Sequence, residues 1–186
     1  MLLGAVGPKT LALAGRHYDG VLLHPFLTDK AITESAEIVR NAAEEAGRDR
    51  SACKVWATLV TAAEQSEEET LAIGPARLLT YVHMQGYGEL LCKVNGWDPA
   101  VLSDIRDHSL FEGGKSADQD FTRYETAAVT SLFPDHWMPD SAALGSAQHC
   151  ANRINDQFDA GANGVLIHGS LPRQVESLLE AYREIR

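Results

Sequence analysis

Two histidines stand where α/β proteins commonly carry out chemistry. His24 and His168 each end a short apolar run, GVLLH at residues 20 to 24 and GVLIH at 164 to 168. Short apolar runs bounded by glycine or proline are typical of buried strands. Substrates of parallel α/β folds bind at the carboxyl ends of the strands. We therefore predict that both histidines contact substrate and that His24 is the candidate catalytic acid–base group. The alternative is a histidine that only hydrogen-bonds a neighbouring loop.

Arg173 follows the second of these runs by a few residues. A guanidinium group binds carboxylates and phosphates through paired N–H donors. The sequence makes Arg173 a candidate for binding an anionic substrate. The alternative is a solvated side chain at the start of a helix.

The stretch LLGAVGPK at residues 2 to 9 has the order strand, glycine turn, helix. Backbone N–H groups at such a turn, together with the helix dipole, bind phosphate. The backbone of Gly4, Ala5, Val6 and Gly7 is therefore a candidate phosphate-binding site. A plain turn without a ligand is the alternative.

Composition argues against several other classes of protein. The net charge of −10 disfavours nucleic-acid binding. No apolar run approaches the roughly 20 residues of a membrane span, and no signal peptide is visible. Three widely spaced cysteines are typical of reduced thiols in the cytosol, and no spacing suggests a metal site. We expect a cytoplasmic protein without nucleic-acid or membrane partners and without metal.

The elements that must position these residues alternate along the chain. Strands are predicted at residues 2–3, 21–24, 54–63 and 164–169. Helices are predicted from Pro8 to just before Gly15, from residue 28 or 29 to Gly47, from Ser66 with a break near 74–75, from Ser146 through 158, and from 170 or 172 to the end. Between 75 and 139 we predict helices at 78–92, 100–108 and 121–132, with an exposed loop at 111–120. Trp137 is interpreted as packing under a loop.

This alternation predicts an α/β fold with a parallel sheet. The segment 14–26, AGRHYDGVLLHPF, is echoed by AGANGVLIHGS at 160–170. The same helix-to-strand unit is therefore used twice, each time with a histidine at the end of the strand.

Two segments resemble the luciferase-like monooxygenase superfamily. GAVGPKTLALAGRHYDGVLLHP at the start is similar to its central strand, turn, helix and strand, and LGSAQHCANRINDQFDAGANGVLIHGSLPRQVESLL is similar to its closing unit. Within the superfamily, they resemble the coenzyme F420-dependent oxidoreductases of the methylenetetrahydromethanopterin reductase type. The resemblance implies the C-terminal half of a (β/α)8 TIM barrel over residues 1–186, about four βα units with a helical insertion at about 75–140.

The resemblance also implies a function. The expected reaction is hydride transfer between a deazaflavin, coenzyme F420, and an organic substrate, with FMN as the alternative cofactor. The Gly4–Gly7 backbone would face the phosphate-bearing tail of the cofactor, and His24 would lie where relatives contact substrate. Half a barrel implies a homo-oligomer or pairing with the missing N-terminal half. A non-catalytic half-barrel interaction subunit or a truncated fragment is the alternative.

Overall fold

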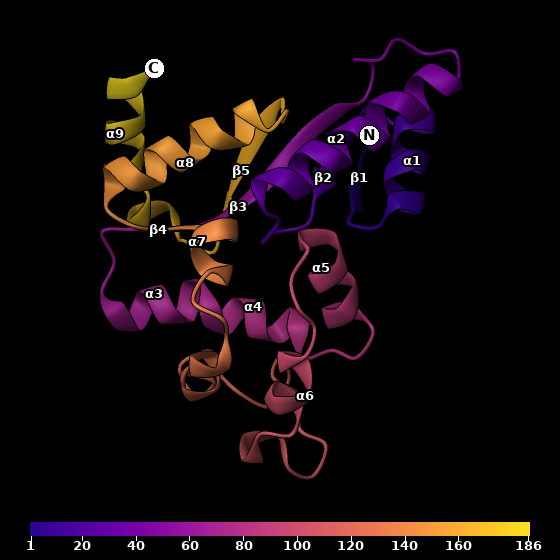
Figure 1. Ribbon diagram of the computed structural model, residues 1–186. Helices are drawn as coiled ribbons and strands as arrows, with labels where there is room; N and C mark the ends of the chain where they lie inside the picture. The colour runs from indigo at the N-terminus through magenta and orange to yellow at the C-terminus, as the bar shows by residue number, and fades with distance from the viewer.

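The computed structural model describes all residues, 1–186, and contains one parallel sheet flanked by helices (Figure 1). All strand pairs are parallel. The predicted α/β class is therefore confirmed. The strands are β1 (Leu2–Ala5), β2 (Gly20–Leu23), β3 (Lys54–Ala63), β4 (Ala142–Gly145) and β5 (Gly164–His168).

The long strand β3 organises the sheet. Trp56 pairs with Leu22 of β2 and with Gly164 of β5, and Val60 likewise has partners in both β4 and β5. A strand can pair along two edges. β5 pairs along one edge of β3, while β2 and β4 both pair along the other edge. The main sheet order is thus β1-β2-β3-β5, and β4 extends it at the end of β3.

The four predicted strands are all present, and β4 is a fifth strand that was not predicted from the sequence. Four small or apolar residues, AALG, form too short a run to distinguish from the end of a helix. Pairing with Val60–Ala63 of β3 makes this segment a strand. The first strand is also two residues longer than predicted.

Four long helices cover one face of the sheet. They are α1 (Pro8–His17), α2 (Asp29–Glu45), α8 (Ala147–Asp159) and α9 (Glu176–Ile185). α1 and α2 pack on each other beside β1 and β2, and α8 lies against β3, β4 and β5 (Figure 1). Thr28 and Ser146 cap α2 and α8 with their hydroxyl groups, as predicted.

Helix α1 was predicted to end before Gly15. In the structure it continues to His17. A Cβ at position 15 would lie 2.2 Å from the Val39 carbonyl oxygen. Gly15 therefore serves the close packing of α1 on α2 and not the end of α1.

The segment between β3 and β4 lies below the sheet in Figure 1. It contains short helices only: α3 (Glu67–Ile73), α4 (Pro75–Val82), α5 (Tyr87–Asn95), α6 (Val101–Arg106), the 3₁₀ turns η1 (Ser109–Phe111) and η2 (Ala127–Leu132), and α7 (Trp137–Ser141). A further 3₁₀ turn, η3 (Pro172–Gln174), precedes α9. No helix in the chain is long and apolar enough to cross a membrane.

Three predictions for this segment were wrong. The helix expected at 78–92 is divided into α4 and α5, since the chain turns at Gly86 with a φ of +80°. The helix expected at 121–132 is only the 3₁₀ turn η2. The loop at 111–120 is not wholly exposed, because Phe111 and Ala117 are buried.

Trp137 is fully buried and stacks on Trp97 with ring centroids 4.5 Å apart. Its predicted structural role is confirmed. This aromatic pair belongs to the large core that joins the short helices to the sheet.

Candidate functional site

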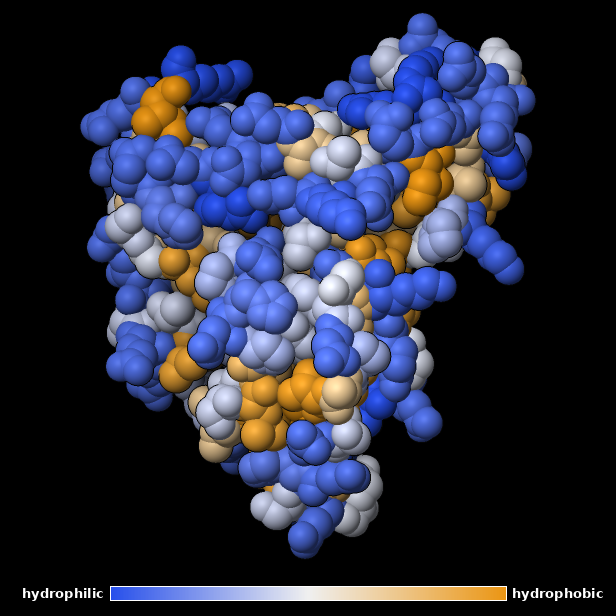
Figure 2. Space-filling view, viewed as in Figure 1, coloured by the Kyte–Doolittle hydropathy of each residue, from blue (hydrophilic) through white to orange (hydrophobic).

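The face of the sheet that points away from α1, α2 and α8 carries exposed apolar side chains. Side chains alternate along each strand. Val21 and Val55 are completely buried on the helix side, whereas Leu2, Trp56 and Leu166 are 56%, 38% and 41% exposed. We call this side the open face. By contrast, the face seen in Figure 2, over α2 and α8, is largely hydrophilic.

A pocket of about 380 Å³ lies on the open face at the carboxyl ends of the strands. It contains the predicted residues His24 and His168 together with most of the glycine turn. No carboxylate lines it. The lining residues are Gly4, Ala5, Val6, Thr10, Leu22, Leu23, His24, Pro25, Thr58, Tyr81, Tyr87, Leu166 and His168.

His24 is held in one orientation by its neighbours. Its Nδ1 lies 2.6 Å from the Pro25 carbonyl oxygen, so Nδ1 carries the proton and donates it. Burial lowers the pKa of His24 to about 4, the Pro25 hydrogen bond opposes this shift, and the charge of His168 adds to it. At neutral pH His24 is therefore uncharged, and its Nε2 can accept a hydrogen bond from a ligand.

Two tyrosines from the segment after β3 close one side of the pocket. The Tyr81 ring packs edge-on against His24 at 4.6 Å, and the Tyr87 ring lies 5.3 Å from it. Burial raises the pKa of Tyr87. Neither tyrosine was predicted from the sequence, because the turn between α4 and α5 that brings them together was expected to be helix.

Two arginines that were not predicted from the sequence, Arg77 and Arg123, act electrostatically on His168. Burial is the main reason that the pKa of His168 is lowered, and the positive charges of Arg77 and Arg123 lower this pKa further. Arg77 lies one helical turn before Tyr81 on α4, so both side chains project from the same face of that helix. That spacing of four residues is the only sequence signal that could have linked Arg77 to the pocket.

The glycine turn leaves backbone donors free. The N–H groups of Val6, Gly7 and Lys9 donate to no acceptor in the chain. No atom outside the turn lies within 4 Å of a Cβ built at Gly4 or Gly7. Free donors at a helix start beneath open space fit a phosphate group.

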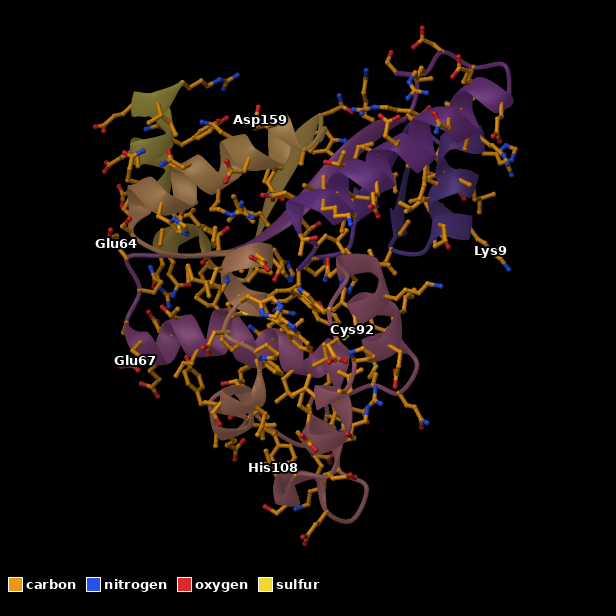
Figure 3. The ribbon with its side chains drawn as sticks, in the orientation of Figure 1. Lys9, Glu64, Glu67, Cys92, His108 and Asp159 are labelled. Atoms are coloured by element: carbon orange, nitrogen blue, oxygen red, sulfur yellow. The ribbon has the colours of Figure 1, made fainter.

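Gly7 itself does not line the pocket, and its φ of −88° is accessible to any residue. Gly7 therefore matters because it leaves space above the backbone, and not because it allows backbone angles that other residues avoid. Lys9 extends away from the sheet at the start of α1 (Figure 3).

Arg173 is not brought together with the two histidines. It is exposed and lines a neighbouring pocket of about 380 Å³ with Arg123, Gly169 and Gln174. No group of three or more histidine, cysteine or carboxylate side chains could hold a metal ion.

Comparison with known proteins identifies the family. The model of the luciferase-like monooxygenase family matches residues 1–164. The chain belongs to the luciferase-like monooxygenase family. This result confirms the resemblance seen in the sequence.

Several luciferase-like proteins are similar to this chain. A 5,10-methylenetetrahydromethanopterin reductase from Methanolobus tindarius is 29% identical over 167 residues, which are 88% of this chain and 46% of the reductase. The coenzyme F420-dependent tetrahydromethanopterin reductase from Methanopyrus kandleri has a similar structure, with a TM-score of 0.69 and 20% identity over 95% of this chain and 47% of its own. A riboflavin lyase determined with modified FMN and riboflavin has a TM-score of 0.58 and 14% identity over 99% of this chain and 42% of its own.

The chain therefore spans about half the length of the luciferase-like relatives that it matches. Its four main strands, in the order β1-β2-β3-β5, correspond to half of the eight-stranded barrel of this family. The open face corresponds to the interior of that barrel.

Proposed function

We propose that this chain is part of an oxidoreductase that transfers a hydride between coenzyme F420 and a small organic substrate. The two reductases similar to this chain support F420, and the riboflavin lyase makes FMN the second candidate. The bound deazaflavin would supply the hydride chemistry. The three free and buried cysteines are consistent with a reducing cytoplasm, where we place the protein.

The observation that carries this proposal is the free backbone of the glycine turn beside the pocket. Val6 and Gly7 offer N–H donors under open space, and Gly4 lies in the pocket with both histidines. These donors and the start of α1 would hold the phosphate of the cofactor tail. The apolar pocket would then hold the ring beside His24.

His24 and His168 would orient the substrate. Because His24 is neutral with its proton on Nδ1, its Nε2 accepts a hydrogen bond from a substrate hydroxyl or amine. Tyr81 and Tyr87 would exclude water from that side. Arg173 would contact only a substrate long enough to reach the neighbouring pocket.

The test is a titration of the chain with F420 and, separately, with FMN. Replacing Gly7→Val places a branched side chain over the free donors and should weaken cofactor binding. The loss of a charge-assisted hydrogen bond costs about 1.5–3 kcal/mol, which is roughly 10- to 150-fold in Kd. Lys9→Ala is the matched control and should bind as the original chain does, since Lys9 is exposed and directed away.

Equal cofactor affinity in the original chain and in a folded Gly7→Val variant would contradict the proposal. Folding of each variant is checked by circular dichroism. Tighter binding of FMN than of F420 would favour the second candidate cofactor.

A non-catalytic half-barrel is the competing function. Its supporting observation is the exposed apolar surface of Leu2, Trp56 and Leu166. In that case neither cofactor would bind, and the open face would serve only to contact another polypeptide.

A further inference from the structure

We infer that Arg77 and Arg123 together bind a carboxylate or phosphate group of the substrate, beside His168 at the carboxyl end of β5. The inference rests on the proposed function, because it names the substrate class of the same site. The two arginines are additional to the glycine turn, which is proposed to hold the cofactor.

Arg77 and Arg123 differ from the other partly or fully buried arginines in having no partner. Neither side chain forms an ion pair, and neither donates a hydrogen bond. The remaining arginines that are shielded from solvent all donate to carboxylate or carbonyl oxygens: Arg40, Arg48, Arg106 and Arg153. Shielded guanidinium groups ordinarily have acceptors, so the absence of acceptors here points to a ligand.

Two nitrogens at this place are buried without an acceptor. They are Nε of Arg77 and Nε2 of His168. The terminal nitrogens of Arg77 and all three side-chain nitrogens of Arg123 are not among the buried unpartnered atoms, so they remain open to solvent. An anion bound between the two guanidinium groups would give these solvent-open nitrogens an acceptor and would neutralise both charges.

The two arginines approach the same end of β5 from different segments. Arg77 comes from the first turn of α4, and Arg123 comes from the loop before η2, where it lines the pocket beside Gly169. Packing brings the two segments together, because Ile73, just before α4, lies against Gly169 and lines the same pocket as Arg123, and α4 packs on η2. The charge of Arg77 accordingly lowers the pKa of Arg123, after the larger effect of burial.

Carboxylates near the pair do not neutralise it. The charge of Asp118 acts on Arg123, yet the two form no ion pair. Glu69 lines the same pocket as Arg123 but accepts a hydrogen bond from Gln174 at 3.2 Å. In a chain with a net charge of −10, a pair of unneutralised arginines is well suited to attract an anion.

The chemistry of the pair indicates the ligand. The planar guanidinium fork matches carboxylate and phosphate oxygens, and a neutral substrate would leave both charges unpaired. The glycine turn lies in the adjoining pocket with His24 and provides for the cofactor phosphate there. The second anion position is therefore assigned to the substrate.

The test follows the side-chain Nε–H signals of Arg77 and Arg123 by NMR in the 186-residue chain, with inorganic phosphate and acetate as probes. Millimolar probe should shift both signals. Arg77→Gln and Arg123→Gln should each weaken phosphate binding by at least about tenfold, the loss expected for one charge-assisted contact. Arg183→Gln, an exposed arginine on α9, is the matched control and should change nothing.

A second titration, with F420, distinguishes the sources of the anion. We expect Arg77→Gln and Arg123→Gln to bind F420 as the original chain does. Weaker F420 binding in both variants would overturn the assignment to the substrate, because the anion would then belong to the cofactor. Unchanged phosphate binding in folded variants would overturn the site itself.

The two proposals fail separately. If phosphate binds at the arginines while F420 does not bind the chain, the anion site stands and the proposed cofactor is wrong. If F420 binds with full dependence on Gly7 while neither probe shifts the arginine signals, the proposed function stands and the anion site is wrong.

Discussion

At the scale of single residues, His24 is the group whose protonation the structure constrains most clearly. Burial against Tyr81 and Tyr87 disfavours the imidazolium form, and the Pro25 carbonyl fixes the tautomer. The unfolded chain binds this proton near the ordinary pKa of histidine, and the folded chain binds it only near pH 4. In acid, protonation of His24 therefore favours the unfolded chain over the folded chain.

The consequence is a measurable loss of stability in acid. Between pH 6.5 and pH 4 the unfolded state binds more protons at His24 than the folded state does, so the free energy of unfolding falls as the pH falls. A shift to about 4 corresponds to at most about 3 kcal/mol. Urea unfolding at pH 7 and pH 4 should show a smaller loss in His24→Asn than in the original chain. Identical losses would mean that His24 is not protected from protonation.

Sequence reasoning found the residues at strand ends but missed those that helices deliver. His24 and His168 were predicted because a strand fixes where its last side chain lies. Arg77 and Tyr81 lie on the short helix α4, Tyr87 follows the turn at Gly86, and Arg123 lies in a loop. Such positions depend on tertiary packing that no local pattern reveals.

At the scale of elements, an ion cluster around the buried Arg153 connects α2 to α8. Arg153 of α8 is 9% exposed and donates to both carboxylate oxygens of Asp29 at 2.8 and 3.0 Å, as well as to Asp156. Gln157 donates to Asp29 as well. Asp29 is the first residue of α2, so its negative charge also favours the start of that helix.

Removing the Arg153 guanidinium should break the ion pairs that connect α2 to α8. We expect Arg153→Met to destabilise the chain by about 1.5–3 kcal/mol, the range for hydrogen bonds to charged groups. Arg50→Met is the control, because Arg50 pairs with Glu37 and Glu44 on the surface and such pairs contribute about 1 kcal/mol or less. Equal losses in the two variants, measured by urea unfolding, would show that the cluster stabilises the chain no more than a surface ion pair does.

The element order was largely predictable, and the exceptions have physical causes. Caps at Thr28, Ser66 and Ser146 marked three helix starts correctly. β4 was missed because pairing with β3, and not its own four residues, makes it a strand. Gly15 was interpreted as a helix end because its contact with α2 is not visible in the sequence.

At the scale of the whole molecule, the sheet has unpaired edges and one uncovered face. β1 pairs only with β2, and β5 pairs only with β3. Leu2, Trp56 and Leu166 are exposed between these edges. Open edges and apolar surface favour association with further strands, either from another copy or from a polypeptide that supplies the other half of the barrel.

We therefore expect the isolated chain to associate and to show little or no F420-dependent turnover by itself. Light scattering at micromolar concentration should give a mass above 20.2 kDa. A monodisperse monomer would contradict the proposed pairing, and robust turnover would show that this chain carries a complete catalytic site.

The central claim is that the free backbone donors of the glycine turn hold the cofactor. The most direct measurement is backbone amide NMR of the chain during a titration with F420. We predict that the Val6 and Gly7 signals shift with the same Kd as the cofactor itself, while the Gly47 signal, beyond the far end of α2, does not move. Saturation with F420 that leaves Val6 and Gly7 unchanged would contradict the account.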